Sequence, residues 1–151
     1  MSVLSAQSIR KARIITPFHE RTVHNGMSYG LGPASYDVRI AQDIVLERGG
    51  FAIASTIERF EMPYDIIGFP KNKSSWARRG VDTSFNTLLD PGWDGYLTVE
   101  LVNHGHATVL IRKGDAIAQI VFMWLDAETE IPYIGQKYSN QPDKPVEAIV
   151  F

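Results

Sequence analysis

Short strands separated by turns constrain this chain more than any other feature of its sequence. From residue 35 onward, apolar or alternating runs recur roughly every eight to twelve residues, a spacing typical of an all-β sandwich or barrel. Turn sequences such as Gly49-Gly50 and Lys113-Gly114-Asp115 separate several of these runs. The sequence therefore predicts an all-β fold with strands at 35–40, 44–46, 51–56, 66–69, 96–103, 107–111 and 116–125.

The first 34 residues are less regular. Ser5 has the chemistry of a helix N-cap, so we expect a short N-terminal helix that ends near Arg13. Glycine and proline recur in residues 16–34, which predicts irregular structure or a loose hairpin. A length of 151 residues without a repeat or a linker fits one domain with one core. We therefore expect a single domain over 1–151, in which residues 131–151 form a C-terminal tail.

Charge and composition argue against several classes of protein. Fifteen Lys and Arg residues against seventeen Asp and Glu residues give a net charge of -2, which argues against a protein that coats DNA or RNA. That balance still permits a small cationic pocket for phosphate. The sequence contains no run of about eighteen apolar residues and no signal-peptide pattern at its start, so we expect a cytoplasmic location.

The absence of cysteine limits the chemistry further. It rules out thiol nucleophiles and cysteine-ligated zinc, and the zinc-dependent base deaminases require a Cys-x-x-Cys pair. The four histidines show no His-Glu-x-x-His spacing. Because His104 and His106 flank Gly105, we expect both to be solvated in the turn of a hairpin between the strands at 96–103 and 107–111.

Hydroxyl groups and cations gather in residues 73–80. Ser74 and Ser75 stand between Lys73 and Arg78, and cations beside hydroxyls suit a phosphate-rich ligand. An alternative role for the two serines is to cap a short helix. The two roles are compatible, because the amides at a helix N-terminus also bind anions.

Period-two alternation sorts the strand at 96–103 into two faces. Glu100 is the only carboxylate of this strand. Two interpretations are open: a rim carboxylate paired with an Arg, or a half-buried base with a raised pKa. The hydroxyl- and cation-rich segment upstream favours the second, and together they indicate a nucleotide-handling hydrolase. The two faces carry Leu97, Val99 and Leu101 on one side, and Tyr96, Thr98, Glu100 and Val102 on the other.

Two further segments have both a structural and a functional interpretation. Asp90 begins an Asp-Pro-Gly turn signal, and turn formation is its simplest role. The polar and aromatic tail at 132–141 is either a frayed C-terminus or a lid. As a lid, Tyr133 would stack on a sugar, Lys137 would reach phosphate and Gln141 would cover the base.

Six segments in order along the chain resemble the dCTP deaminase and dUTPase superfamily, and its deaminase branch most closely. The similarity extends from about residue 35 to residue 141, most of the chain. The segments are Ser35-Tyr36-Asp37-Val38-Arg39, residues 73–80, Asp90-Pro91-Gly92-Trp93-x-Gly95, Thr98-Val99-Glu100-Leu101, Gly114-Asp115-Ala116-Ile117-Ala118-Gln119 and Lys137-Tyr138-x-x-Gln141.

The resemblance implies a distorted, jelly-roll-like β-barrel of the dUTPase type, which assembles as a homotrimer with three active sites at subunit interfaces. It also implies that magnesium is held through the nucleotide triphosphate and that zinc takes no part. By this similarity Glu100 is the general base, which activates water for attack at C4 of cytosine. Arg78 and Ser74 match residues that hold this water and the exocyclic nitrogen. The implied reaction converts dCTP to dUTP and ammonia.

The same resemblance assigns contacts to the nucleotide. Ser75 and Lys73 match triphosphate contacts, although the family usually has Arg at the position of Lys73. Lys in place of Arg keeps the charge but loses the bidentate fork. Asp90 matches the carboxylate with which the dUTPase branch holds the deoxyribose 3′-hydroxyl or activates the attacking water.

The loop at 81–89 departs from the deaminase pattern because it is shorter. In the family this loop lies against the base, so we expect Asn86 and Thr87 to contact the pyrimidine or the water. The shortening leaves the choice of base open. A dUTP pyrophosphatase, a bifunctional enzyme that releases dUMP, and a nucleotide-binding trimer without catalysis are the alternatives to a dCTP deaminase.

Overall fold

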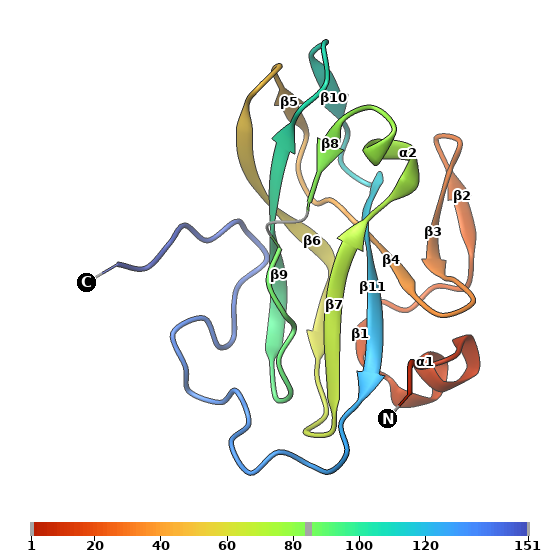
Figure 1. Cartoon of the computed structure of the whole chain (residues 1–151), viewed down its shortest axis with the longest axis vertical. Coiled ribbons are helices and arrows are strands. Elements are labelled where there is room, and N and C mark those ends of the chain that lie inside the picture. The colour runs from red at the N-terminus through yellow and green to blue at the C-terminus, as the bar shows by residue number, and fades with distance from the viewer. Residues whose placement is uncertain (1, 84–85, 151) are drawn as a thin grey trace.

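The computed structural model describes residues 2–83 and 86–150, and antiparallel strands dominate it (Figure 1). The predicted all-β architecture is confirmed. None of the helices that the structure describes is long and apolar enough to span a membrane. The elements of the described residues are, in chain order, α1 (Ala6–Ala12), β1 (Ile15–Thr16), β2 (Thr22–His24), β3 (Met27–Leu31), β4 (Tyr36–Arg39), β5 (Ile44–Leu46), β6 (Phe51–Glu61), β7 (Ile66–Asn72), α2 (Ser74–Ala77), β8 (Val81–Asp82), β9 (Asp94–Asn103), β10 (Val109–Ile111) and β11 (Ala116–Trp124).

Two sheets contribute most of the hydrophobic core. The strand orders are β2-β3-β4-β11-β7 in one sheet and β1-β6-β9-β8 in the other, while β10 and β5 form a separate pair. Val38 of β4, Val99 of β9 and Ile120 of β11 are fully buried between them. The alternation predicted for β9 is confirmed, because residues 97, 99 and 101 are buried and the residues between them are partly exposed.

The N-terminal region folds as the sequence predicts. Ser5 caps α1, because its hydroxyl accepts a hydrogen bond from the Ser8 amide at 3.4 Å, and Ile9 is buried beneath the helix. The loose hairpin predicted within residues 16–34 is the pair β2–β3, which turns at Asn25-Gly26. Both turn residues have positive φ angles, 50° and 75°, as the favoured two-residue hairpin turn requires.

The predicted hairpin between β9 and β10 is wrong. β9 lies between β6 and β8, whereas β10 pairs with β5. The buried Asn103 side chain explains the departure, because its amide nitrogen donates to the Leu46 carbonyl at 2.9 Å and the Ala107 carbonyl at 2.8 Å. These bonds turn the chain toward β5. His104 and His106 are nevertheless exposed in the connection, as predicted.

The predicted serine cap of α2 is also wrong. Lys73 is the N-cap: it is extended, with φ -84° and ψ 130°, and its carbonyl accepts a hydrogen bond from the Trp76 amide at 3.1 Å. Ser74 and Ser75 therefore lie exposed within the helix. Trp76 attaches α2 to the core, since its indole N–H donates to the Ala116 carbonyl at 2.7 Å.

Candidate active site

A cavity of about 740 Å³ lies on the solvent-facing side of β6 and β9. The C-terminal segment passes below the sheets and then runs beside β9, where it closes one side of the cavity (Figure 1). The loop at 87–90 closes another side. The volume suits a nucleotide, since pockets for small ligands typically measure about 300–1,000 Å³. Five residues predicted for the site line this cavity: Thr87, Asp90, Glu100, Tyr133 and Gln141.

Glu100 faces the cavity from β9. Its side chain is half-buried, and burial raises its pKa above the usual value of a glutamate. Its Oε2 atom is buried and has no hydrogen-bond partner in the described residues. No Arg or Lys within that part of the chain forms an ion pair with it. Within the described residues of one chain Glu100 is therefore not paired with an Arg, and its half-buried position agrees with the second interpretation.

Side-chain amides hold the described part of the loop at 83–89 against the barrel. The Asn72 side-chain carbonyl accepts hydrogen bonds from the backbone amide and the hydroxyl of Thr83, both at 2.6 Å. The Asn86 side-chain carbonyl accepts from the Glu100 backbone amide at 2.8 Å. Asn86 is thereby placed at the edge of β9 beside Glu100, and its own amide nitrogen has no partner among the described residues.

Asp90 and Trp93 form the two ends of the predicted turn. The Trp93 amide donates to the Asp90 carbonyl at 2.9 Å, and Gly92 between them has a φ of 87°, a conformation that favours glycine. Trp93 packs against Tyr133 with ring centroids 5.5 Å apart. Turn formation, the structural role predicted for Asp90, is confirmed. The buried indole N–H of Trp93 also lacks a partner within the described residues.

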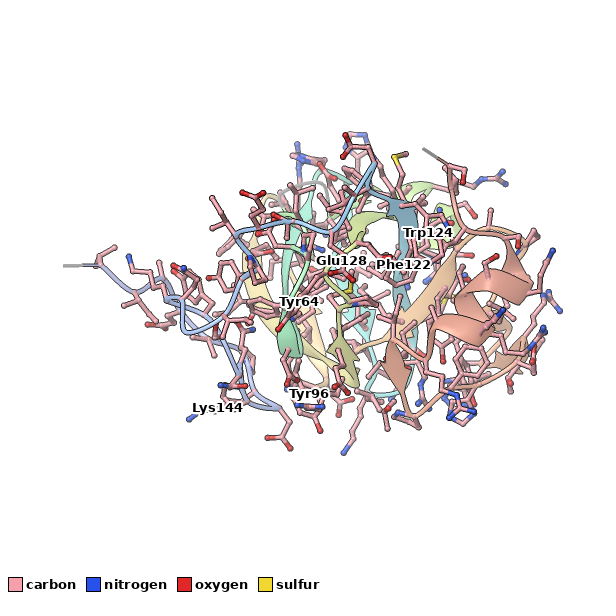
Figure 2. The ribbon with its side chains drawn as sticks, turned by 90° about the horizontal axis from the view of Figure 1, so that it is seen from below. Tyr64, Tyr96, Phe122, Trp124, Glu128 and Lys144 are labelled. Carbon is pink, nitrogen blue, oxygen red and sulfur yellow. The ribbon has the colours of Figure 1, made fainter. Side chains whose placement is uncertain are left out.

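The C-terminal tail is held on β9 and is not frayed. The Tyr96 amide donates to the Gln141 carbonyl at 3.0 Å. The buried Gln141 side chain donates its amide to the Thr98 hydroxyl, and the Val146 amide donates to the same hydroxyl at 3.1 Å. Figure 2, a view from below, shows Tyr96 on β9 and Lys144 on the tail at the same side of the molecule. The tail therefore covers the cavity in the way expected of a lid.

Sequence reasoning gave no role to Thr98 or Asn72. Thr98 stands two residues before Glu100 on the same face of β9, and this position is the signal that points to it. Asn72 carries no such signal. Its partner Thr83 lies eleven residues further along the chain, and α2 stands between the two residues in the sequence.

The hydroxyl- and cation-rich segment at 73–80 does not line this cavity. Figure 1 shows α2 and the C-terminal segment on opposite sides of β8 and β9. Lys73 is buried, and its Nζ donates to an Asp37 carboxylate oxygen at 2.8 Å. The single chain thus assembles only part of the predicted site. The residues that remain exposed outside the cavity are Ser74, Ser75, Arg78 and Lys137.

Comparison with known proteins identifies the fold and the family. Residues 37–125 match the family model described as dCTP deaminase-like. The chain belongs to this family. A dCTP deaminase from Pyrococcus abyssi is 37% identical over 142 residues, which cover 84% of this chain and 86% of that protein. A dCTP deaminase from Campylobacter hominis is 29% identical and is matched over 93% of this chain and 88% of its own length.

Solved structures agree with this fold. The 2′-deoxycytidine 5′-triphosphate deaminase from Agrobacterium tumefaciens superposes with a TM-score of 0.64 at 19% identity, over 82% of this chain and 49% of that one. A native EIAV dUTPase superposes with a TM-score of 0.60 at 19% identity, over 82% and 98% of the two chains. The predicted dUTPase-like barrel and the predicted enzyme family are therefore confirmed.

Proposed function

We propose that this member of the dCTP deaminase-like family hydrolyses dCTP to dUTP and ammonia. The observation that carries the proposal is Glu100, whose buried Oε2 has no partner in the described residues and whose side chain lines a cavity of nucleotide size. Relatives named dCTP deaminases, which match most of the chain, supply the substrate class. A carboxylate with an open acceptor is the group that the reaction requires as a base.

Glu100 acts on the attacking water. Burial raises its pKa, which makes the carboxylate a stronger base. The ionised carboxylate takes a proton from water as the oxygen bonds to C4 of cytosine. The same carboxyl then delivers that proton to the exocyclic nitrogen, the C4–N4 bond breaks, and ammonia leaves. The proton of the new C4 hydroxyl moves to N3 as the C4 carbonyl forms. The products are dUTP and ammonia, and the carboxylate is regenerated.

The remaining predicted contacts come from a neighbouring copy of the chain in the proposed homotrimer. Ser74 and Ser75 lie on α2, Arg78 is its C-cap, and all three are exposed. Since α2 lies across β8 and β9 from the tail (Figure 1), these residues can enter the cavity of an adjacent subunit. Arg78 and Ser74 would hold the water and the exocyclic nitrogen there, and Ser75 would bind the triphosphate. The Lys73 ammonium has three donors, so its contact with Asp37 still leaves donors for a phosphate oxygen.

Contacts from the same subunit complete the proposal. Asp90 would hold the deoxyribose 3′-hydroxyl, Tyr133 would stack on the sugar, and Lys137 and Gln141 would close over the triphosphate and the base. Magnesium would be bound by the triphosphate oxygens of the substrate, which are ligands of the type that it prefers. Within the described residues no group of three His, Asp or Glu side chains is arranged to hold a metal. A cytoplasmic location stays a prediction.

The test is to incubate the purified protein with magnesium and either dCTP or dUTP, and to resolve the products by ion-exchange chromatography. The proposal is supported if dCTP yields dUTP and ammonia while dUTP in the parallel incubation is left unchanged. Asp90 lies in the same cavity, which favours a second candidate, the dUTP pyrophosphatase or bifunctional enzyme. Release of dUMP from either nucleotide would establish that candidate. Tight binding without any product would indicate a non-catalytic nucleotide-binding trimer.

A further inference from the structure

The side chain that lies beside Glu100 on the neighbouring strand is apolar. Ile53 of β6 and Glu100 of β9 are partners in the antiparallel pairing of the two strands. The next pair along, Ala54 and Val99, is fully buried in the core, so Ile53 and Glu100 both face the opposite, solvent-facing side. Directly opposed residues on one face have Cβ atoms about 4.5–5.5 Å apart. Both residues also line the cavity of about 740 Å³.

An aliphatic side chain is unusual at this position, because the outer face of an antiparallel sheet normally carries polar residues. Ile53 is half-buried, and Phe51, two residues earlier on the same strand, lines the same cavity. Neither side chain can form a hydrogen bond or an ion pair with a carboxylate. Hydrocarbon therefore covers Glu100 on the side of β6, which agrees with an Oε2 atom that is buried and has no partner in the described residues.

No cation of the described residues lines the cavity beside Glu100. The other ionisable side chains that line it among those residues belong to Asp90, Tyr133, Tyr138 and Glu147. On β8, the strand at the other side of β9, Asp82 lies 3.4 Å from His104 Nε2. In the proposed trimer, Arg78 of an adjacent subunit is the cation that would enter the cavity. Within one chain, the surroundings of the Glu100 carboxylate are thus set by its apolar neighbours.

We propose that Ile53 is a positioning residue for the reaction: it keeps solvent away from the side of the Glu100 carboxylate that faces β6 and so leaves the carboxylate to the attacking water. This inference rests on the proposed function, because it takes Glu100 to be the base. A carboxylate that has few hydrogen bonds and little water around it is a stronger base. Burial is the largest influence on the pKa of Glu100 and raises it, as this cover requires. Ile53 therefore acts through Glu100.

The test replaces Ile53 by Thr and by Val, two β-branched side chains of nearly the same shape. Thr places beside Glu100 a hydroxyl that can donate a hydrogen bond to the carboxylate, whereas Val cannot. The titration of Glu100 is followed in the free protein by carbon-13 NMR of labelled glutamate carboxyl groups, and Glu100→Gln identifies its signal. We expect Glu100 to titrate about one pH unit lower in Ile53→Thr than in Ile53→Val, because a hydrogen bond to the ionised form favours that form.

Turnover of dCTP should follow the same order. Ile53→Thr should move the acid limb of the kcat/KM profile to lower pH and lower the plateau of kcat by roughly threefold to tenfold, since a weaker base removes a proton less readily. Ile53→Val should keep both close to wild type. Ile57→Thr is the matched control, because it makes the same change at a half-buried residue of β6 that does not line the cavity. It should leave the titration of Glu100 and the acid limb unchanged.

A purely structural role for Ile53 predicts lower stability in Ile53→Thr without any movement of the acid limb. That result would overturn the inference, and so would equal titration of Glu100 in Ile53→Thr and Ile53→Val. If the wild-type protein converts dCTP to dUTP, either result leaves the deaminase proposal standing. Failure of the wild-type protein to convert dCTP would overturn the proposed function and, with it, the role of Ile53 in the reaction, whatever the NMR titration shows.

Discussion

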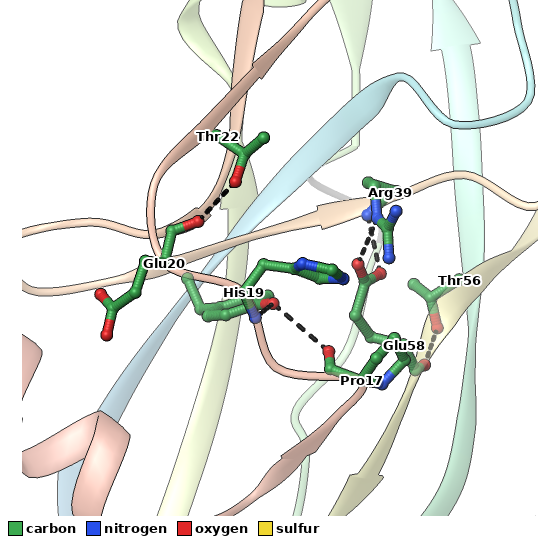
Figure 3. Close-up of polar contacts among 8 residues, drawn as sticks. Pro17, His19, Glu20, Thr22, Arg39, Thr56 and Glu58 are labelled. Atoms are coloured by element: carbon green, nitrogen blue, oxygen red, sulfur yellow. Dashed lines mark hydrogen bonds and ion pairs between the residues drawn. The ribbon is translucent and has the colours of Figure 1, made fainter.

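Two glutamates on adjacent strands, Glu58 on β6 and Glu100 on β9, differ in their partners. Burial raises the pKa of both side chains. Figure 3 shows that Arg39 satisfies Glu58: its backbone amide donates to Oε2 and its Nε to Oε1, each at 2.8 Å. The Arg39 guanidinium also lies 4.5 Å from the centre of the Tyr29 ring. Glu100 has no such cation in the described residues, and its Oε2 lacks any partner there.

The difference teaches how to separate a structural carboxylate from a reactive one. In Glu58 both oxygens are engaged, and the side chain is 0% exposed, so neither water nor substrate can reach it. In Glu100 one oxygen is unused and the side chain lines a cavity. Burial and a raised pKa alone do not distinguish the two residues. The distinction lies in whether the charge already has a partner.

The largest effect is expected for Glu100→Gln. The amide keeps the shape of the side chain but cannot accept a proton, so deamination should fall by about 10²–10⁴-fold. The rate of ammonia release from dCTP at saturating substrate measures this change. Affinity for dCTP should change little, because the triphosphate contacts are untouched. An unchanged rate would show that Glu100 is not the base and would move the assignment to the pyrophosphatase candidate.

The same substitution at Glu58 should act on stability instead. Glu58→Gln leaves the Arg39 guanidinium without its charge partner, and breaking a buried ion pair costs about 3–5 kcal/mol. Chemical denaturation should show this loss, while the folded fraction keeps its turnover rate. A double variant with Arg39→Met should recover part of the stability, because no unpaired charge remains. If Glu58→Gln instead abolished turnover in a stable protein, the contrast between the two glutamates would be broken.

A smaller effect is expected at the attachment of the tail. Thr98→Val removes the hydroxyl that accepts hydrogen bonds from Gln141 and Val146. With a net value of about 0.5–1.5 kcal/mol for each bond, the two together contribute about 1–3 kcal/mol. KM for dCTP should therefore rise by roughly fivefold or more, and kcat should change less. Thr98→Ser keeps the hydroxyl and is the matched control. Equal KM values for both variants would show that these bonds do not hold the lid.

Removal of the whole tail should have a larger effect on binding than Thr98→Val but should preserve the fold. Truncation after Ile131 deletes Tyr133, Lys137 and Gln141, so the cavity loses one wall. Light scattering should report the same assembly as for the untruncated protein, because α2 and the sheets are intact, while KM rises by more than tenfold. Full catalytic efficiency in the truncated protein would mean that the tail covers the cavity without serving as a lid.

The smallest effect concerns the pH dependence of stability. Since the pKa of Glu100 is higher in the folded than in the unfolded protein, protonation favours the folded state. Below about pH 4.3, the pKa of a glutamate in the unfolded protein, Glu100 contributes its full stabilisation to the wild-type protein. That contribution is lost as the pH rises through the pKa of Glu100 in the folded protein. Glu100→Gln should accordingly be more stable than wild type at pH 7, and the difference should vanish at acid pH. An advantage that persists at acid pH would have another cause.

Much of the site follows from sequence pattern alone. The two-residue period of β9 places Glu100 on the solvent-facing side, because successive side chains of any strand point to opposite faces. The turn at Asp90 and the N-cap at Ser5 follow from side-chain chemistry that acts over a few residues. The hairpin from β9 to β10 could not be obtained in this way, because the side chain of Asn103 diverts the chain to β5.

The sequence by itself determined the strand pattern, the family and the chemical identity of the candidate base. Only the tertiary structure decided that Lys73 is paired with Asp37, that the tail lies on Thr98 and that Glu100 is left with an open oxygen. The physical reason is the range of the interactions. Backbone geometry fixes the direction of a side chain within a strand, whereas the partners of a buried charge come from residues far away in the chain.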